Sequence, residues 1–407
     1  MIAMRVDLRY ILQFDLFRNM RLIAGAEGLE HTISGCGILD YELDRSLNGK
    51  YSYSNFSSDQ LVLTSFLFAR DDPFLVDEAI KHLISLNGCG LAIRNIYRLP
   101  IHDYILRYAD TKKFPIFLIE DKKLFFEDII LQVDRCIRIA ERAELVEERL
   151  NRLLYESLDP AEAERIIAQV FPTVNSSYYL AFFRNHGESS EQMRQQVFRC
   201  FDRLAAEGGT QAVLPYGNGF FFFRSRENLP SPASDSAFTQ SIAQARELLP
   251  EMCVGLSDIH HYAEEMEQAL REAMSAATIH AMRRRESDFD APFLSYRDIG
   301  IYRALLPAAR DAALQNYSRM VLEPLIGFDA ENRSALLDTV LDLVRCGGDL
   351  HVLSKRRGEH ENTLRNRLDK VHTLTGLNYR KPAQYEELAL AARVLMLGRS
   401  EHYFSLL

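Results

Sequence analysis

Short apolar runs alternate with helix-like patterns over the first 124 residues of the chain. Residues 60–67, 90–93 and 114–119 are mostly apolar and have the length of buried strands. Between them, residues 75–84 and 102–108 carry apolar side chains at the three- and four-residue spacing of amphipathic helices. Strands that alternate with helices in this way form a parallel sheet covered on both faces. The pattern predicts an N-terminal α/β domain over residues 1–124.

The connecting segment, residues 125–165, has the pattern of a long helix. Its apolar stripe consists of Ile130, Val133, Ile137 and Ala140, followed by Val146, Leu150 and Leu153. The stripe is interrupted at residues 141–145. A dimerising or signal-carrying helix would show such spacing. Because each half of the stripe covers only about two turns, we expect an amphipathic connector packed against its own domains.

A second α/β domain is predicted over residues 166–290. Residues 177–183 and 253–257 have the pattern of strands, and residues 238–248 that of a helix. Two apolar runs at 212–223 flank an Asn-Gly turn, which is typical of a β-hairpin. A long helix is expected through Ala269, Ala273 and Ala277.

Near the C-terminus, one predicted helix has a packed side and a polar side. Leu364, Leu368 and Val371 recur at the spacing of a buried stripe. At 3.6 residues per turn, Asn362 and Asn366 lie opposite that stripe. The remaining polar positions are Thr363 and Lys370 to one side, with Arg365 and Arg367 on the margins. Amides that pair with base edges and cations that contact phosphate suit a helix in a DNA major groove. An ordinary amphipathic surface helix is the alternative.

The preceding segment favours the DNA-binding interpretation. Ser334 is the expected cap of a helix that ends at Gly347-Gly348. A short helix at residues 350–356 and a tight turn at residues 357–360 follow. Helix, short helix, glycine-containing turn and amphipathic helix together form a helix-turn-helix.

Charge is distributed unevenly along the chain. Residues 333–381 hold ten Lys/Arg and six Asp/Glu, a net charge of +4, whereas the whole chain carries −9. A basic module within an acidic protein is expected where only that module meets phosphate.

Several C-terminal motifs resemble those of PucR-type regulators, the purine-catabolism and sugar-diacid families of bacterial transcription factors. The resemblance covers roughly residues 295–400 and rests on residues 298–306, 322–326, 347–350, 360–365, 367–368 and 374–377. The chain departs from the family at Arg357 and Glu359, where apolar residues are usual, and at Asn366, where Tyr is frequent.

The other two domains resemble further parts of the same regulators. Residues 22–25, 28–29, 61–65 and 114–116 resemble the N-terminal sensory domain, which implies effector sensing without naming the effector. The central domain is similar to the degenerate GGDEF-like domain of these proteins. In active nucleotide cyclases the hairpin carries metal-binding acids, but residues 216–220 here hold no carboxylate. Cyclase activity is therefore not expected; nucleotide binding without turnover stays open, and a structural or dimerising role is favoured.

Ligands of open α/β sheets tend to bind beyond the carboxyl ends of the strands. The residues so placed, and predicted to bind the effector, are Thr64, Ser65, Arg94, Asn95, Glu120 and Asp121. Loop and cap roles are the alternative for each of them. The segment from Gly25 to Gly28 lies in no predicted strand–turn–helix context and is not expected to be a phosphate loop.

Signals of catalysis or metal binding are weak. His260 and His261 precede Glu264 and Glu265 at a spacing that would suit a metal, but we expect solvated helix residues because no third ligand is near. The six cysteines are scattered without a CxxC pair, which argues for reduced thiols. No apolar run approaches the ~20 residues of a membrane span, and the N-terminus has no signal-peptide pattern. A length of 407 residues with 47% apolar and 26% charged residues indicates a globular protein of several domains.

Together these patterns predict a cytoplasmic, effector-responsive regulator of a catabolic operon (purine, ureide or organic-acid use), with no cofactor and no enzymatic activity. It is expected to bind a double-stranded operator as a homodimer or higher oligomer. Predicted base contacts are Asn362, Thr363, Asn366 and Lys370, and predicted phosphate contacts are Arg365, Arg367, Lys355 and Arg356, with His360 at the start of the helix. A nucleotide-binding or nucleotide-cyclising enzyme and a protein-interaction module are the alternatives.

Overall fold

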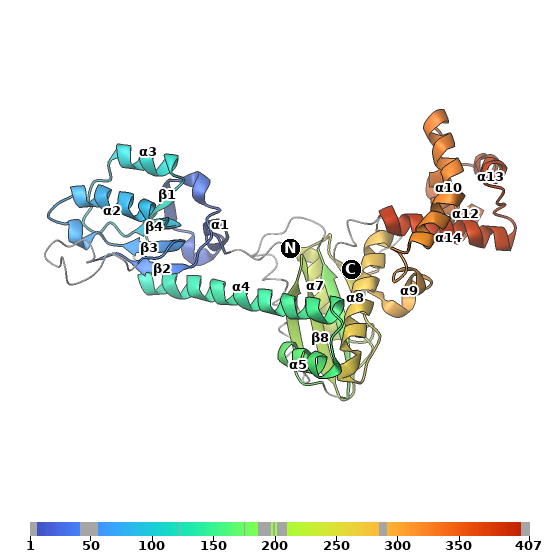
Figure 1. Cartoon of the computed structure of the whole chain (residues 1–407), viewed down its shortest axis with the longest axis horizontal. Helices are drawn as coiled ribbons and strands as arrows, with labels where there is room; N and C mark the ends of the chain where they lie inside the picture. Colours follow the sequence, from blue (N-terminus) through green and yellow to red (C-terminus); the bar gives the residue numbers. More distant parts are fainter. Residues whose placement is uncertain are drawn as a thin grey trace.

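The computed structural model describes residues 6–40, 56–121, 123–174, 176–185, 197, 200–201, 210–284 and 291–399. Figure 1 shows an N-terminal α/β unit, a central α/β unit and an all-helical C-terminal unit in a row. The predicted fold class is therefore confirmed. In the described part of the chain, no helix is both long and apolar enough to cross a bilayer.

The N-terminal unit is built on a five-stranded sheet with the order β1-β5-β4-β3-β2. Its strands are β1 (Met20–Ala24), β2 (Gly35–Ile38), β3 (Gln60–Thr64), β4 (Gly90–Ile93) and β5 (Ile116–Ile119). The predicted parallel pairing of the three central strands is confirmed, and β2 extends it, whereas β1 runs antiparallel to β5. The two edge strands escaped prediction because each exposes much of its surface and so lacks a continuous apolar run.

Helices cover both faces of this sheet. One face packs against α2 (Phe74–Ser85) and α3 (Asp103–Thr111), the two predicted helices. The other face packs against α1 (Leu8–Ile11) and the first half of a long helix, α4 (Phe126–Tyr155). The sheet is thus buried on both sides, as parallel sheets require.

Two local predictions in this unit are wrong. The strand expected to reach residue 67 ends at Thr64, whose hydroxyl accepts the backbone N–H of Phe66 at 3.0 Å while Phe66 turns to a positive φ of 55°. The turn at Gly25 does follow a strand, β1. A Cβ on Gly25 would lie 2.1 Å from the carbonyl oxygen of Phe114, so glycine is needed there for close packing.

Helix α4 is continuous for 30 residues and belongs to two cores. Val133 and Ala140 pack under the N-terminal sheet, and Leu150 and Leu154 pack in the central unit. Figure 1 shows it reaching from the first unit to the second. The apolar stripe is interrupted near residue 143 because α4 there stops packing on the N-terminal sheet and begins to pack in the central unit. The helix itself is not broken there.

The central unit has a second five-stranded sheet, in the order β10-β9-β6-β8-β7. Its strands are β6 (Ser177–Arg184), β7 (Thr210–Tyr216), β8 (Gly219–Arg226), β9 (Cys253–Leu256) and β10 (Leu294–Ser295). The predicted hairpin is confirmed, with Tyr216 opposite Gly219. The end of α4, α5 (Pro160–Val170) and α8 (Met266–Arg284) cover one face, and α7 (Ser236–Leu248) lies on the other.

His260 is not the solvated residue that its sequence context suggested. It is 6% exposed, and its Nε2 lies 2.8 Å from the Glu272 carboxylate of α8. Its backbone pairs with Tyr178 of β6, which draws the imidazole into the core. The prediction failed because the partner lies twelve residues away, on another element.

The C-terminal unit consists of α10 (Ala312–Asn332), α11 (Leu336–Arg345), α12 (Leu350–Arg357), α13 (Glu361–Thr375) and α14 (Pro382–Arg399), preceded by α9 (Tyr302–Leu305). Leu305 of α9 and Leu397 of α14 pack with Ile279 of α8, so a shared apolar cluster joins this unit to the central one. Ser334 does not cap α11, contrary to prediction. Instead, the Asp329 carboxylate accepts the backbone N–H groups of Leu336 and Leu337, each at 2.9 Å.

Candidate nucleic-acid interface

Helices α12 and α13 are joined by the predicted tight turn. Asp349 caps α12 by accepting the backbone N–H of Val352 at 3.0 Å. Gly358 has a φ of 63°, a conformation that costs glycine little. His360 then caps α13, its Nδ1 accepting the backbone N–H of Asn362 at 3.2 Å. These local devices define the angle at which α13 leaves the turn.

The inner side of α13 is the apolar stripe that the sequence predicted. Leu364 and Leu368 are fully buried with Leu353 of α12 and Leu343 of α11. Val371 packs in the neighbouring cluster formed with α10, α11 and α14. Two packed clusters therefore hold α13 along its length and direct its other side to solvent.

The outer side of α13 is open. Asn362, Thr363 and Asn366 are exposed, as predicted. Among the described residues, Thr363 and Asn366 make no side-chain hydrogen bond. Lys355 and Arg356 at the end of α12 likewise form no ion pair within the described part of the chain. A ligand can therefore bind these four side chains without breaking a hydrogen bond or ion pair of the described residues.

The remaining predicted DNA contacts already have partners within the protein. Arg365 donates from Nη2 to Glu361 at 2.7 Å and from Nη1 to Asn362 at 3.3 Å. The Lys370 ammonium lies 4.9 Å from the centre of the Phe328 ring on α10. Both side chains are exposed, so exchanging these contacts for phosphate or base contacts costs little.

Arg367 belongs to a set of ion pairs that the sequence did not predict. It donates to Glu359 at 2.8 Å, Glu359 also accepts from Arg357 at 3.0 Å, and Arg357 donates to Asp342 of α11 at 2.7 Å. The hydrogen bond from Arg367, followed by that from Arg357, holds the pKa of Glu359 below its ordinary value. We call this chain of charges the turn network. It includes Arg357 and Glu359, the two residues at which the sequence departs from the family pattern.

The residues predicted to bind the effector do gather at the carboxyl edge of the N-terminal sheet, but their side chains make internal contacts. Thr64 is fully buried and donates to the Leu39 carbonyl. Ser65 donates to Asp40 at 3.1 Å, and Asn95 bonds the backbone of residue 99. Glu120 forms an exposed ion pair with Arg21 of β1 at 2.7 Å.

Arg94 connects this edge to α4. Its Nη2 donates to the carbonyl of Asp121 at 3.1 Å and also to that of Leu124. The guanidinium lies 5.5 Å from the ring centre of Phe125, the residue that precedes α4. Arg94 therefore connects the carboxyl end of β4 to the segment that precedes the long helix.

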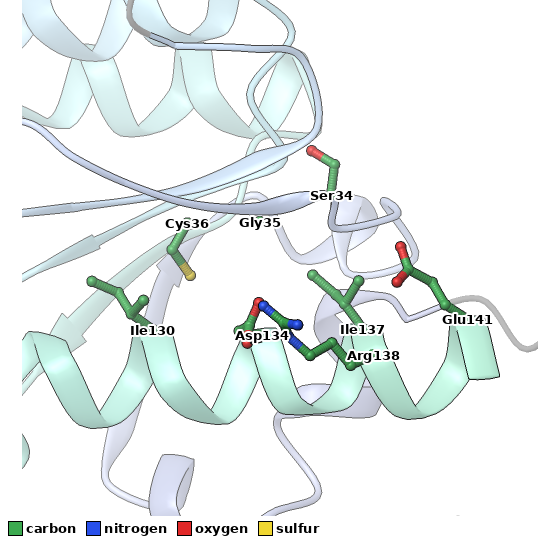
Figure 2. Close-up of a pocket in the computed structure, with 8 residues that line it drawn as sticks. All are labelled: Ser34, Gly35, Cys36, Ile130, Asp134, Ile137, Arg138 and Glu141. Carbon is green, nitrogen blue, oxygen red and sulfur yellow. Dashed lines mark hydrogen bonds and ion pairs between the residues drawn. The ribbon is translucent and has the colours of Figure 1, made fainter. Parts of the chain in front are cut away.

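A pocket of about 470 Å³ lies between β2 and α4. Figure 2 shows Ser34, Gly35 and Cys36 of the β2 segment facing Asp134 and Arg138 of α4 across it. Burial, and then the charge of Asp134, raise the pKa of the Cys36 thiol to about 12. The thiol is thus protonated and unreactive at neutral pH.

The tip of the central hairpin, residues 216–220, has no carboxylate that could bind a metal ion. Asn218 at the turn donates to the Asn185 carbonyl at 2.7 Å. Among the described residues, no group of three or more His, Cys, Asp or Glu is arranged to hold a metal ion.

Two family comparisons match this architecture. The purine catabolism regulatory protein-like family matches residues 10–137, which include the first part of α4, and the PucR C-terminal helix-turn-helix domain matches residues 336–394. No curated protein sequence matches the chain. The crystal structure of a regulator of polyketide synthase expression from Bifidobacterium adolescentis is similar at 19% identity and a TM-score of 0.30, over 62% of this chain and 97% of that one.

The two family matches agree with the geometry at both ends of the molecule. The first covers the N-terminal sheet with its covering helices, and the second covers α11 to α13 and most of α14. The chain is therefore a transcriptional regulator with a helix-turn-helix DNA-binding domain, and its two matched domains are those of PucR-type regulators.

Proposed function

We propose that this regulator reads operator DNA with the outer side of α13 and controls a catabolic operon in response to a small molecule. The operon would serve purine, ureide or organic-acid use. One observation supports DNA reading by α13: its residues Asn362, Thr363 and Asn366 are exposed, whereas the opposite side of the helix is packed against α11 and α12. An amide side chain can pair with an adenine edge through two hydrogen bonds. Because the Asn366 side chain makes no hydrogen bond to the described residues, it can do so without breaking one of them.

Phosphate contacts are proposed for the cations that flank this side. Lys355 and Arg356 project from the end of α12, and Arg365 lies on the exposed margin of α13. In this proposal Arg367 and Lys370 exchange their internal partners for DNA, and His360 lies at the start of α13. A single helix buries too little surface for tight specific binding, so two copies on paired half-sites are expected.

Effector binding is proposed for the N-terminal unit. The carboxyl edge of its sheet, with Ser65, Arg94, Asn95 and Glu120 around the buried Thr64, is the candidate place. The contacts of Arg94 with the segment before α4 support this choice, since they connect that edge to the helix that enters the central unit. A thermal-shift screen of purines, ureides and organic acids, repeated with Arg94→Ala, tests it. A stabilising compound whose effect survives Arg94→Ala unchanged would exclude a role of Arg94 in binding.

The proposal assigns no catalytic step to this chain and requires no cofactor. The hairpin tip lacks the hard anionic ligands that two metal ions on a triphosphate need. A DNA-binding regulator works where the chromosome is, so we place its action in the cytoplasm.

The decisive experiment is genomic footprinting followed by binding to the operator and to random DNA. Asn366→Ala should reduce operator affinity by about 1–3 kcal/mol and leave random-sequence affinity nearly unchanged. Asn332→Ala, the same truncation at the exposed end of α10, is the matched control and should change neither. Equal losses on both DNAs with Asn366→Ala would contradict base reading by α13.

A further inference from the structure

The outer face of α4 carries an exposed row of side chains with a seven-residue repeat. Leu131 is 68% exposed and Leu145 is 44% exposed, although both are large and apolar. Arg138 lies midway between them and is also exposed. Because seven residues make almost two turns, the three side chains stack along one line of the helix. We call Leu131, Arg138 and Leu145 the outer row.

Charged rows with the same repeat flank the outer row. On one flank stand Asp134, Glu141 and Glu148, the acidic row. This flank lies at the edge of the pocket beside β2, which Asp134, Arg138 and Glu141 also line. On the other stand Arg135, Arg142 and Arg149, the arginine row. All of these are exposed except Arg149, which is half-buried. In the first half of α4, the buried residues, including Val133 and Ala140, lie on the opposite side of the helix, against the N-terminal sheet. In the second half, Leu150 and Leu154 pack in the central unit.

The two charged rows determine how a second copy of this helix can pack. In a parallel pair related by a two-fold axis along the helices, the acidic row of each copy lies beside the arginine row of the other. In an antiparallel pair, acids face acids and arginines face arginines. Flanking charges of this kind set partner and orientation in paired helices, and like charges placed together oppose association.

We propose that the outer row of α4 is the dimer interface of this protein, and that a second copy docks there in parallel. The arrangement is isologous, since each copy supplies the same row. Leu131 would pack against Leu131 of the second copy, and Leu145 would pack against Leu145 of the second copy. Arg138 would lie near the axis with its charge balanced by Asp134, whose Oδ2 is 2.7 Å from its Nε.

Parallel docking also suits the architecture around α4. Both copies of the chain leave a parallel pair of helices at the same end, towards their central and C-terminal units. Two DNA-binding domains on one side can reach paired half-sites, as the proposed function requires. In this respect the inference rests on the proposed function; the charge pattern of α4 stands independently of it. The apolar content of the row is small, so the dimer should be salt-sensitive.

Cysteine cross-linking of the full-length chain without DNA tests the orientation. Leu131→Cys and Leu145→Cys should each form a disulfide with a second copy of the same variant under mild oxidation. The wild-type chain supplies the background from its six native cysteines. Cross-links mainly between the two different variants in a mixture would overturn parallel docking. A monomer in sedimentation velocity at all concentrations, without cross-links, would overturn the interface.

Charge reversal tests the pairing of the rows. Arg135→Glu with Arg142→Glu should weaken self-association by at least about tenfold, as should Asp134→Arg with Glu141→Arg. Mixing these two variants should restore association as a heterodimer. Arg18→Glu with Arg107→Glu, the same change at two exposed arginines of the N-terminal unit, is the control and should have no effect. Failure of the mixture to associate would contradict the proposal, and because DNA is absent, that result is separate from any failure of operator binding.

Discussion

The Arg357 guanidinium of α12 donates to the Asp342 carboxylate of α11 over 2.7 Å, and both side chains are less than 20% exposed. The same guanidinium donates to Glu359 in the turn before α13. Two helices and the turn are thus held by one side chain at a position where apolar residues are usual in the family. The turn before α13, the helix proposed to read DNA, is thus held by a largely buried charge.

Arg357→Ala should loosen the helix-turn-helix. It leaves Asp342 and Glu359 each short of a partner in a half-buried place, which should cost about 1–3 kcal/mol. Hydrogen exchange of the α12 and α13 amides in the full-length protein measures the loss. Arg357→Leu with Glu359→Leu should recover part of it, since apolar packing substitutes well for the Arg357–Glu359 pair, while Asp342 retains Arg345 as a partner. Unchanged exchange in the single variant would show that the turn network is not stabilising.

Two arginines near the DNA face should behave differently. Arg356→Ala should lower the slope of log K against log salt by about 0.9 without changing amide exchange, since it removes one phosphate contact and no internal one. Arg367→Ala removes the partner of Glu359 and should also speed exchange in the turn. Salt titrations of operator binding together with exchange measurements separate the two effects. Identical behaviour of the two variants would contradict the division.

The buried pair of His260 and Glu272 should give the central unit a pH-dependent stability. Burial alone would lower the pKa of His260, but the hydrogen bond and charge of Glu272 outweigh it and raise the pKa above 6.5. Burial likewise favours a higher pKa of Glu272, yet hydrogen bonds from His260, Gln268 and the Asp258 backbone lower it below 4.5.

The directions of the two pKa shifts define the pH range in which the pair of His260 and Glu272 stabilises the folded protein. The contribution of Glu272 is present above its ordinary pKa of 4.5 and is lost as the pH falls through its folded value. That of His260 is present below its ordinary pKa of 6.5 and is lost as the pH rises through its raised folded value. His260→Gln should therefore lower the melting temperature more at pH 5.5 than at pH 8.5. An equal loss at both values would mean that the charge of His260 does not contribute.

Gly255 in β9 should tolerate no side chain. A Cβ there would lie 2.0 Å from the backbone nitrogen of Ala277 in α8. The alanines along α8 and this glycine let helix and strand approach closely, so Gly255→Ala should cost about 3 kcal/mol or more. Thermal unfolding of the full-length variant checks this. Gly327→Ala, in open space on α10, is the control and should change stability little.

Elements with a local signal could be predicted from the amino-acid sequence. The stripe of Leu364, Leu368 and Val371 predicted α13 with its buried side, because a helix repeats every 3.6 residues and burial follows that period. The glycines at 348 and 358 marked the ends of α11 and α12, because few other residues adopt a positive φ cheaply. The core strands of both sheets were visible for a related reason: full burial requires continuous apolar runs.

Features that join residues far apart in the chain could be seen only in the folded protein. The edge strands β1 and β2 form because they pair with β5 and β3, whose own sequences are apolar enough to be recognised as strands. Asp329 rather than Ser334 caps α11, and Glu272 draws His260 into the core, because the partner that satisfies a polar group is selected by distance in space. The hydrogen bond from Arg357 to Asp342 is the clearest example. The two residues are fifteen positions apart, so no helical or strand periodicity predicts their contact. The contact contributes to stability only once α11 and α12 pack together.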